Sequence, residues 1–361
     1  MRLPRVKAPH RPHRLADGRV RLGGTVYKIA VELKDPDGWI WAMLELMDGT
    51  RSPDDIAATL ADRFPRFGEH ELLDGLRQLI GTGYVEDAAE PPPDGLTPRE
   101  QDRYSRSTQL YQWMNLNPGE PNWLPQQRLR TAAAVVVGVG GTGGAAALAL
   151  AMSGVGRIHC VEPDVVELSN LNRQVLYTEH DIGRPKVEAA VERLRAHNSD
   201  IQLSGERREV LGPDDLVELG EGYDLLVLAG DRPLEIRGWA NQAALKLGIP
   251  WVYGGYHGPQ ITAGAFRPGQ GPCYECVRLS DRDRHPVVDQ DEPVPPSHPA
   301  NAISAVMSGT LLAHAAMALI TGAPKLPVNC VYGMNLVAPD HSFVITAEAP
   351  RPDCTHCGAG G

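Results

Sequence analysis

The chain has 361 residues, of which 42% are hydrophobic and 22% charged, and its acidic side chains outnumber the basic ones by 45 to 35. This length is typical of two or three globular domains, each large enough to bury a core. The net charge of −10 disfavours general nucleic-acid binding, which requires positive charge. No apolar run approaches the ~20 residues of a membrane span, and the basic start has no apolar stretch behind it. We therefore expect a cytoplasmic protein that binds neither membrane nor nucleic acid.

The first part of the chain predicts a small domain of strands and helices. Residues 14–34 contain short β-forming runs separated by glycine turns, which predicts an antiparallel meander. The segment GWIWAMLELMDG has helical spacing, and Ser52-Pro53 predicts the cap and first turn of a second helix. A further apolar stripe over residues 72–80 predicts a third helix. Residues 1–90 are thus expected to form a winged-helix-like α+β domain.

A proline-rich stretch separates this domain from the rest of the chain. In AAEPPPDGLTP, consecutive prolines remove backbone donors and fix φ, so residues 91–102 are expected to be a semi-rigid linker. Beyond it, AAAVVVGVGGTGG is an apolar run that ends in glycines, as in a parallel strand buried on both faces. Repeated β-α-β units then predict a doubly wound, Rossmann-like α/β domain over residues 103–361.

Glycines lie between the first of these strands and the helix after it. They allow the backbone to approach a pyrophosphate, and a helix N-terminus supplies N–H donors and the positive end of a dipole. A tight turn without a ligand has a similar composition, so the loop alone does not decide between the two. The candidate residues are Gly138, Gly140, Gly141, Gly143 and Gly144.

Polar residues follow the next two strand ends. Glu162 stands where an acidic residue commonly accepts from ribose hydroxyls, in NAD and ATP enzymes alike. The segment LSNLNRQVLYTEHDIGRPK then offers Asn170, Arg173 and Lys186 as partners for a triphosphate, which requires fixed cations and a metal. A solvated polar loop is the alternative. Asp231, after a later apolar strand, suits Mg²⁺, which takes one or two carboxylates plus phosphate oxygens. It could also cap the following helix.

Four of the six cysteines form two CxxC pairs. Two such pairs predict a closed, tetrahedral Cys₄ zinc site with a structural role; redox-active pairs are the alternative. Cys160 lies in a predicted strand and is expected to be a core thiol, whereas a reactive role for Cys330 stays open. The predicted zinc ligands are Cys273, Cys276, Cys354 and Cys357.

Several motifs occur in the order typical of one family. From about residue 103 to residue 361, the chain resembles the ThiF/MoeB class of adenylating enzymes, which includes ubiquitin-activating enzymes. The match covers RYSR (residues 103–106), the glycine loop, SNLNRQ, GRPK, Asp231 and both CxxC pairs. The resemblance implies an ATP-dependent adenylyltransferase, in which a carboxylate attacks the ATP α-phosphate to give an acyl-adenylate and pyrophosphate.

The resemblance also implies roles for individual residues. Asn170, Arg173 and Lys186 match phosphate-contacting positions, and Asp231 matches the Mg²⁺-binding aspartate. Glu162 stands where the family usually has an aspartate for the ribose.

Further positions match outside the phosphate-binding segment. Arg106 resembles the arginine that such dimers insert into the partner's active site, which implies a homodimer, although Ser107 departs from the usual RYSRQ. Arg237 and Asn241 fit the helix that follows the aspartate.

Residues 14–87 resemble the PqqD-like precursor-recognition domains, which bind a leader peptide by strand addition beside a helix. A winged-helix DNA-binding domain, given the basic residues in 2–21, and a dimerisation wing are the alternatives. The two-part architecture resembles adenylating enzymes of the microcin C type.

Together these features predict ATP- and Mg²⁺-dependent adenylation of a carboxylate on a ribosomally synthesised precursor peptide, in natural-product (RiPP) biosynthesis. The stretch 277–301 contains no cysteine, so an enzyme thioester is not expected. One alternative is an adenylyltransferase for a ubiquitin-like sulfur carrier protein. Another is a non-catalytic, leader-binding scaffold for a partner cyclodehydratase, although such a scaffold would not need the triphosphate-binding residues.

Overall fold

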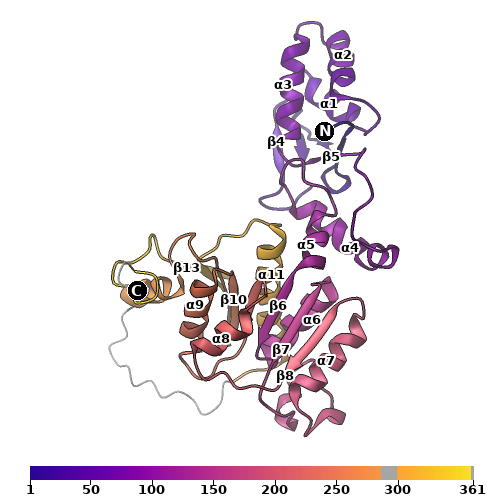
Figure 1. Ribbon diagram of the computed structural model, residues 1–361. Helices are drawn as coiled ribbons and strands as arrows, with labels where there is room; N and C mark the ends of the chain where they lie inside the picture. The colour runs from indigo at the N-terminus through magenta and orange to yellow at the C-terminus, as the bar shows by residue number, and fades with distance from the viewer. Residues whose placement is uncertain (286–298, 359–361) are drawn as a thin grey trace. The chain divides into compact units, whose positions relative to one another are not determined.

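The computed structural model describes residues 1–285 and 299–358, and the chain divides into two compact units. Unit 1 comprises Met1–Gln127 and Thr321–Lys325, and unit 2 comprises Arg128–Ile320 and Leu326–Gly361. Figure 1 follows the chain through both units by colour.

Unit 1 combines two small antiparallel sheets with short helices. One sheet pairs β1 with β5 and the other has the order β2-β3-β4, which confirms the predicted meander. The pairing of β1 with β5 was not anticipated from the sequence. The elements are β1 (Pro4–Val6), η1 (Ala8–His10), β2 (His13–Arg14), β3 (Val20–Leu22), β4 (Val31–Leu33), α1 (Trp39–Leu46), α2 (Pro53–Arg63), α3 (Glu69–Ile80), β5 (Val85–Asp87) and α4 (Pro98–Met114).

The start of α2 follows from its first residues. The Ser52 side chain accepts from the backbone N–H of Asp55, and the Asp55 carboxylate accepts from the Ser52 N–H. This reciprocal cap satisfies two N–H groups that a helix start leaves without partners. The helices bury one shared core, which includes Met43, Ile56 and Leu76.

Helix α4 begins inside the segment expected to be a linker. Thr97 caps it, Glu100 completes the reciprocal cap, and Pro98 occupies the first turn, where no N–H is needed. The segment that follows is tied to the N-terminal strands, because the buried Lys7 Nζ donates to the Asn115 carbonyl at 2.8 Å. The segment without regular structure therefore ends before residue 98, and the helix that begins there belongs to unit 1.

Unit 2 contains an eight-stranded sheet with the order β13-β12-β11-β10-β9-β6-β7-β8. The strands from β8 to β10 are parallel, as the predicted Rossmann-like domain requires, whereas β11, β12 and β13 extend the sheet in antiparallel fashion. The strands are β6 (Ala133–Val137), β7 (Arg157–Val161), β8 (Gln202–Glu206), β9 (Leu225–Leu228), β10 (Trp251–His257), β11 (Gln260–Phe266), β12 (Cys330–Asn335) and β13 (Ala338–Thr346).

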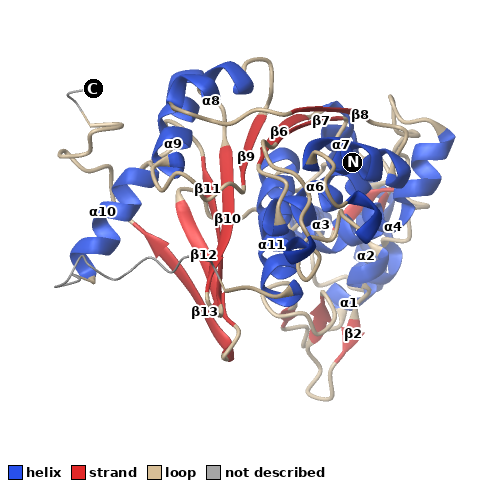
Figure 2. Cartoon of the chain, turned by 90° about the horizontal axis from the view of Figure 1, so that it is seen from below, coloured by secondary structure: helices blue, strands red, loops and turns tan. Residues whose placement is uncertain are grey.

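Helices cover both faces of this sheet, as Figure 2 shows, with α8, α9 and α10 on one face and α6, α7 and α11 on the other. Strands β6 and β9 are buried along their whole length, which explains their near-continuous apolar sequence. The helices are α6 (Gly141–Ser153), α7 (Lys186–His197), α8 (Pro213–Gly220), α9 (Ile236–Leu247), α10 (Tyr274–Arg284) and α11 (Ala302–Thr321), and α5 (Leu124–Thr131) crosses the boundary between the units.

Helix α11 corrects the expectation that no apolar run approaches 20 residues. Its best 18-residue window has a mean hydropathy of 1.8, and in the described part of the chain it is the one helix long and apolar enough to cross a membrane. Just over half of that window is buried inside the protein. Gly309 lies so close to Thr142 of α6 that a Cβ there would be 2.3 Å from the Thr142 carbonyl oxygen. The apolar character is thus used for packing against α6.

The strand order creates a topological switch point. β6 has β7 on one side and β9 on the other, so the connections that leave the sheet there diverge. In open α/β sheets, ligands bind at the carboxyl ends of strands at such a point.

Candidate nucleotide site and cysteine cluster

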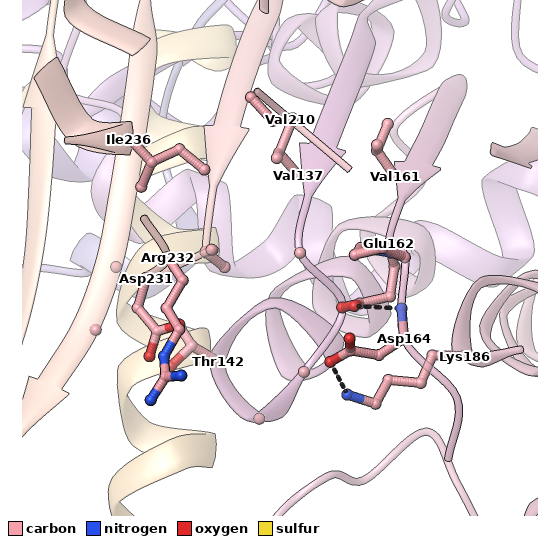
Figure 3. Close-up of a pocket in the computed structure, with 18 of the residues that line it drawn as sticks. Val137, Thr142, Val161, Glu162, Asp164, Lys186, Val210, Asp231, Arg232 and Ile236 are labelled. Atoms are coloured by element: carbon pink, nitrogen blue, oxygen red, sulfur yellow. Dashed lines mark hydrogen bonds and ion pairs between the residues drawn. The ribbon is translucent and has the colours of Figure 1, made fainter. Parts of the chain in front are cut away.

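A cavity of about 770 Å³ opens at the carboxyl ends of β6, β7, β9 and β10, at the switch point (Figure 3). Most of the residues predicted to bind a nucleotide line it. They are Gly138, Gly140, Gly141, Glu162, Asn170, Arg173, Lys186 and Asp231, and Arg237 of α9 joins them.

The glycine loop brings the start of α6 to this cavity. Gly138 has a φ of +87°, and a Cβ there would lie 2.7 Å from the backbone nitrogen of Gly230. Gly140 is the N-cap of α6, so the first N–H groups of the helix lack partners within it. Gly143 is not part of the cavity wall, because it faces the loop itself: a Cβ would lie 1.8 Å from the Gly138 carbonyl oxygen.

Glu162 holds the loop in place. Its carboxylate accepts from the Val139 N–H at 2.9 Å and from the Asp164 N–H at 3.2 Å. Burial raises the pKa of Glu162, and the nearby Lys186 ammonium opposes that shift. Both carboxylate oxygens are therefore already engaged with the backbone at the place predicted for the ribose.

Lys186 is the first residue of α7, and its side chain is buried against the cavity wall. Its Nζ lies 2.9 Å from Oδ2 of Asp164, and its backbone N–H donates to the Asp164 carbonyl. Figure 3 shows this ion pair on one side of the cavity. The sequence alone does not single out Asp164, whose signal is only an acidic residue two positions after Glu162.

The polar segment after β7 forms tight turns at the cavity. The Asn170 Oδ1 accepts from the Glu167 N–H at 3.0 Å, and the Arg173 guanidinium donates to the Ser169 carbonyl at 2.8 Å. Arg173 also lies beside Tyr256 of β10, where it opposes the rise in the pKa of Tyr256 that burial causes.

Gln174 is a second candidate that the sequence did not single out. It is buried and lines the cavity, and its Oε1 has no hydrogen-bond partner among the described residues. Because a buried amide oxygen without a partner is costly, this atom is a candidate acceptor for a ligand in the cavity.

Asp231 follows β9 and stands, with Arg232, across the cavity from Lys186 (Figure 3). The first turn of α6 lies between the two sides. The cavity therefore offers a carboxylate for a cation and a lysine for an anion, on either side of a helix N-terminus. This arrangement suits a polyphosphate with its metal ion.

The two CxxC pairs meet at one point of unit 2. Four of their Sγ–Sγ separations are 3.4, 3.6, 3.8 and 3.9 Å, and all four sulfurs lie within 4.8 Å of one another. Zn–S bonds of about 2.3 Å place tetrahedral sulfurs about 3.8 Å apart, whereas a disulfide requires about 2.05 Å. Burial raises the pKa of the Cys273 thiol, and that of Cys357 to about 11, and a bound cation reverses this effect. The donor set thus fits zinc.

The remaining predicted residues lie elsewhere. Arg106 is an exposed residue of α4 in unit 1. Cys160 is fully buried in β7, where burial raises its pKa to about 12, as expected of a core thiol. Cys330 is buried at the start of β12, its thiol faces the Pro327 carbonyl at 3.6 Å, and burial raises its pKa. Asn241 points to the cysteine cluster.

Residues 104–356 match the ThiF family. The chain is 37% identical over 154 residues to the sulfur carrier protein ThiS adenylyltransferase of Bacillus subtilis, which covers 42% of this chain and 45% of the relative. It is also 37% identical over 186 residues to the sulfur carrier protein adenylyltransferase of Thermus thermophilus, covering 50% of this chain and 65% of the relative. The matches thus span about half to two thirds of these curated relatives.

Solved structures of Escherichia coli MccB are similar along almost the whole chain. MccB alone superposes with a TM-score of 0.77 at 24% sequence identity, over 98% of this chain and 96% of MccB. MccB has also been solved with ATP and, described as a microcin C7 biosynthetic enzyme, with N-formylated MccA. At this identity the likeness establishes a shared fold.

Proposed function

The chain belongs to the ThiF family, and from this membership we propose that it is an ATP-dependent adenylyltransferase. The observation that carries the proposal is the cavity at the switch point, where Lys186, Arg173 and Asp231 surround the glycine loop. The names of the two sequence relatives, both adenylyltransferases, support the same activity.

In the proposed reaction, a substrate carboxylate oxygen attacks the α-phosphorus of ATP. The new P–O bond gives an acyl-adenylate, and the bond between the α-phosphorus and the bridging oxygen breaks, so that pyrophosphate leaves with the electron pair. The N–H groups at the start of α6, with Lys186 and Arg173, stabilise the charge that develops on the phosphates. Asp231 would hold Mg²⁺, which supplies charge neutralisation on the phosphate oxygens.

We also propose that the cysteine cluster holds one structural zinc ion. The sulfur separations and the absence of a fifth side-chain ligand from the described cluster fit a closed site. Such a site joins the start of α10 to the C-terminal segment that carries Cys354 and Cys357.

For the substrate, we favour a precursor peptide captured by unit 1. Among the described residues, β4 pairs with β3 on one side and with no strand on the other, so we propose that this other edge accepts an added strand. Apolar side chains lie exposed around it, with Tyr27 86% and Val31 38% accessible. The shared fold with MccB, which was solved with MccA, supports this choice over the second candidate.

The second candidate is adenylation of a ubiquitin-like sulfur carrier, which the names of the two sequence relatives favour. In either case we propose a homodimer in which Arg106 acts in the partner's active site; its exposure on α4 leaves it accessible to a second chain.

The test is pyrophosphate exchange into ATP. The wild-type protein should catalyse exchange that depends on a short precursor peptide encoded near its gene, and a ubiquitin-like carrier should not replace that peptide. Asp231→Ala should lower the exchange rate by at least about 100-fold, because the metal loses its carboxylate. Asp214→Ala is the matched control, since Asp214 is exposed on α8 and pairs only at the surface with Lys246. Wild-type exchange by Asp231→Ala would refute the assignment, and stimulation by the carrier alone would favour the second candidate.

A further inference from the structure

Helix α9 lies between the two sites of unit 2. Arg237, in its first turn, lines the nucleotide cavity, and Asn241, one turn later, reaches the cysteine cluster. Residues four apart lie on the same side of a helix, so a single helix face meets both places.

Asn241 is almost fully buried, at 1% exposure, and every polar group of its side chain has a partner. Its Nδ2 lies 3.4 Å from Sγ of Cys273 and 2.8 Å from Nδ1 of His356. Its Oδ1 accepts from the backbone N–H of Tyr274 at 3.1 Å. A backbone N–H can only donate, so the contact with Tyr274 fixes the orientation of the amide.

The orientation of the Asn241 amide determines which neighbouring atoms accept its hydrogen bonds. With Oδ1 turned to Tyr274, the two hydrogens on Nδ2 point to the sulfur and to the imidazole. Nδ1 of His356 therefore accepts, and in the neutral ring the proton is carried by Nε2. That nitrogen lies 3.1 Å from Nε2 of Gln242, so the Gln242 amide must turn over to present its oxygen as the acceptor.

The cluster thus has N–H donors directed at its sulfurs. Asn241 donates to Cys273, and the backbone N–H of Arg351 lies 3.3 Å from Sγ of Cys276. Donors of this kind orient metal ligands and spread the negative charge of thiolates. Of these two donors, only the one on Cys273 comes from a side chain that substitution can remove.

The same asparagine reaches the cavity through Tyr274. This residue follows Cys273 and is one of the residues that line the nucleotide cavity. It packs edge-on against Tyr253 at 5.5 Å between ring centroids, and the Arg237 guanidinium lies 4.8 Å above the Tyr253 ring. Asn241 therefore bonds to the backbone of one wall of the cavity and to a sulfur of the cluster.

We propose that Asn241 is a positioning residue that strengthens metal binding by the cysteine cluster and sets the place of Tyr274 in the cavity wall. The inference rests on the proposed zinc site. It adds a contribution to metal affinity from outside the four cysteines.

The experiment compares the full-length protein with Asn241→Leu and Asn241→Asp. Leucine removes all three bonds at similar volume, and aspartate keeps an acceptor for Tyr274 but removes the donor to Cys273. Zinc affinity is measured by competition with a chromogenic chelator. Both variants should bind zinc about 10- to 100-fold more weakly than the wild-type protein. In both variants loaded with Co²⁺, the sulfur-to-metal charge-transfer bands should shift relative to the wild-type protein. A residue that only supported the fold would not produce this shift. Gln242→Ala is the matched control, because Gln242 is exposed and its side chain lies beside Nε2 of His356, away from Nδ1.

Wild-type zinc affinity and unchanged Co²⁺ bands in a folded Asn241→Leu protein would overturn the inference. If neither variant folds, NMR of the wild-type protein loaded with ¹¹³Cd decides the matter. A scalar coupling between cadmium and the Asn241 amide protons is expected through Cys273, and its absence at full loading would equally overturn the inference. A wild-type protein that binds no zinc would instead refute the proposed metal site.

Discussion

Gly143 illustrates how little space separates α6 from the loop before it. A Cβ at this position would lie 1.8 Å from the Gly138 carbonyl oxygen and 2.8 Å from the Cβ of Ala229. Both neighbours belong to the loops that form the cavity floor, so neither moves without disturbing the nucleotide site. The glycine, expected from its motif to contact the nucleotide, is explained by packing.

We therefore expect Gly143→Ala to destabilise the protein by at least about 1–3 kcal/mol, since overpacking against backbone has no flexible neighbour to absorb it. Thermal unfolding measures the effect. Gly212→Ala serves as the control, because Gly212 has extended backbone and nothing within 4 Å of its Cβ position. Equal unfolding temperatures for the two variants would contradict the packing explanation.

Some residues that line the cavity or contact the cysteine cluster could be predicted from the sequence, and others could not. Asp231 was identified because it follows an apolar strand, and Arg173 and Lys186 because they lie in a polar segment after a buried strand. The structure places all three around one cavity. Gln174 was not singled out although it ends the SNLNRQ segment, because its burial and its Oε1 without a partner are visible only in the structure. Asn241 was noted only for its place on the helix after Asp231, and that place does not reveal its contact with the cysteine cluster. Only their surroundings distinguish them.

Among the elements, the short N-terminal turn η1 is held by a histidine. The His10 ring is fully buried between Tyr84 and Trp113, at centroid distances of 5.1 and 5.3 Å, and its Nε2 lies 2.9 Å from the Gln112 carbonyl oxygen. Its Nδ1 has no partner among the described residues. A proton added to Nδ1 would thus be buried without an acceptor.

Burial accordingly lowers the pKa of His10 from 6.5. The unfolded chain binds the proton more readily than the folded one, so this contribution to stability is complete above pH 6.5 and decreases as the pH falls below it. For a single proton this loss cannot exceed about 1.4 kcal/mol for each pH unit below 6.5. Urea unfolding at several pH values measures it. His10→Phe cannot take up a proton and should lack this part of the pH dependence; an identical slope in both proteins would refute the explanation.

Some helices and strands were predicted from the sequence and others were not, and the difference follows from how far apart along the chain the interacting residues lie. Helices α1, α2 and α3 and strands β6, β7, β9 and β10 follow from local periodicity and turn residues. The β1–β5 pair joins residues about 80 positions apart along the chain, as in the partners Arg5 and Glu86, and no local pattern encodes such a pairing. The antiparallel strands β11 to β13 were likewise not recognised, because alternation over a few residues does not specify which edge a strand extends.

At the scale of the whole molecule, peptide capture is proposed for unit 1 and chemistry for unit 2. Removing residues 1–90 would be a poor test of this division, because Lys7 and His10 are bonded to residues in or just after α4. A substitution at the proposed binding edge is more informative.

We expect Val31→Asp to weaken precursor-peptide binding by at least about tenfold, because an added strand would bury the new charge. ATP affinity should not change. Calorimetry with each ligand measures both, and Leu110→Asp, an exposed apolar position on α4, is the control. Peptide affinity equal to that of the control would argue against capture at β4.

Metal removal provides a second test at this scale. Metal analysis of carefully prepared protein should find about one zinc per chain. Stripping the metal with a chelator should lower the unfolding temperature of unit 2, whereas unit 1, which has a separate core, should keep its own transition. If the chelator abolished the unfolding transitions of both units together, or if the preparation contained no zinc, the assignment of the cysteine cluster as a zinc site would be contradicted.

The cysteine cluster has one more consequence, which concerns the unfolded chain. Its two pairs are separated by 81 positions, from Cys276 to Cys357, so a bound metal closes a loop of that length. By analogy with a disulfide, while the metal stays bound such a cross-link restricts the unfolded chain and raises its free energy by about 4–5 kcal/mol at 25 °C. A single backbone cut inside that loop would leave two fragments still joined through sulfur, and a chelator would then release them.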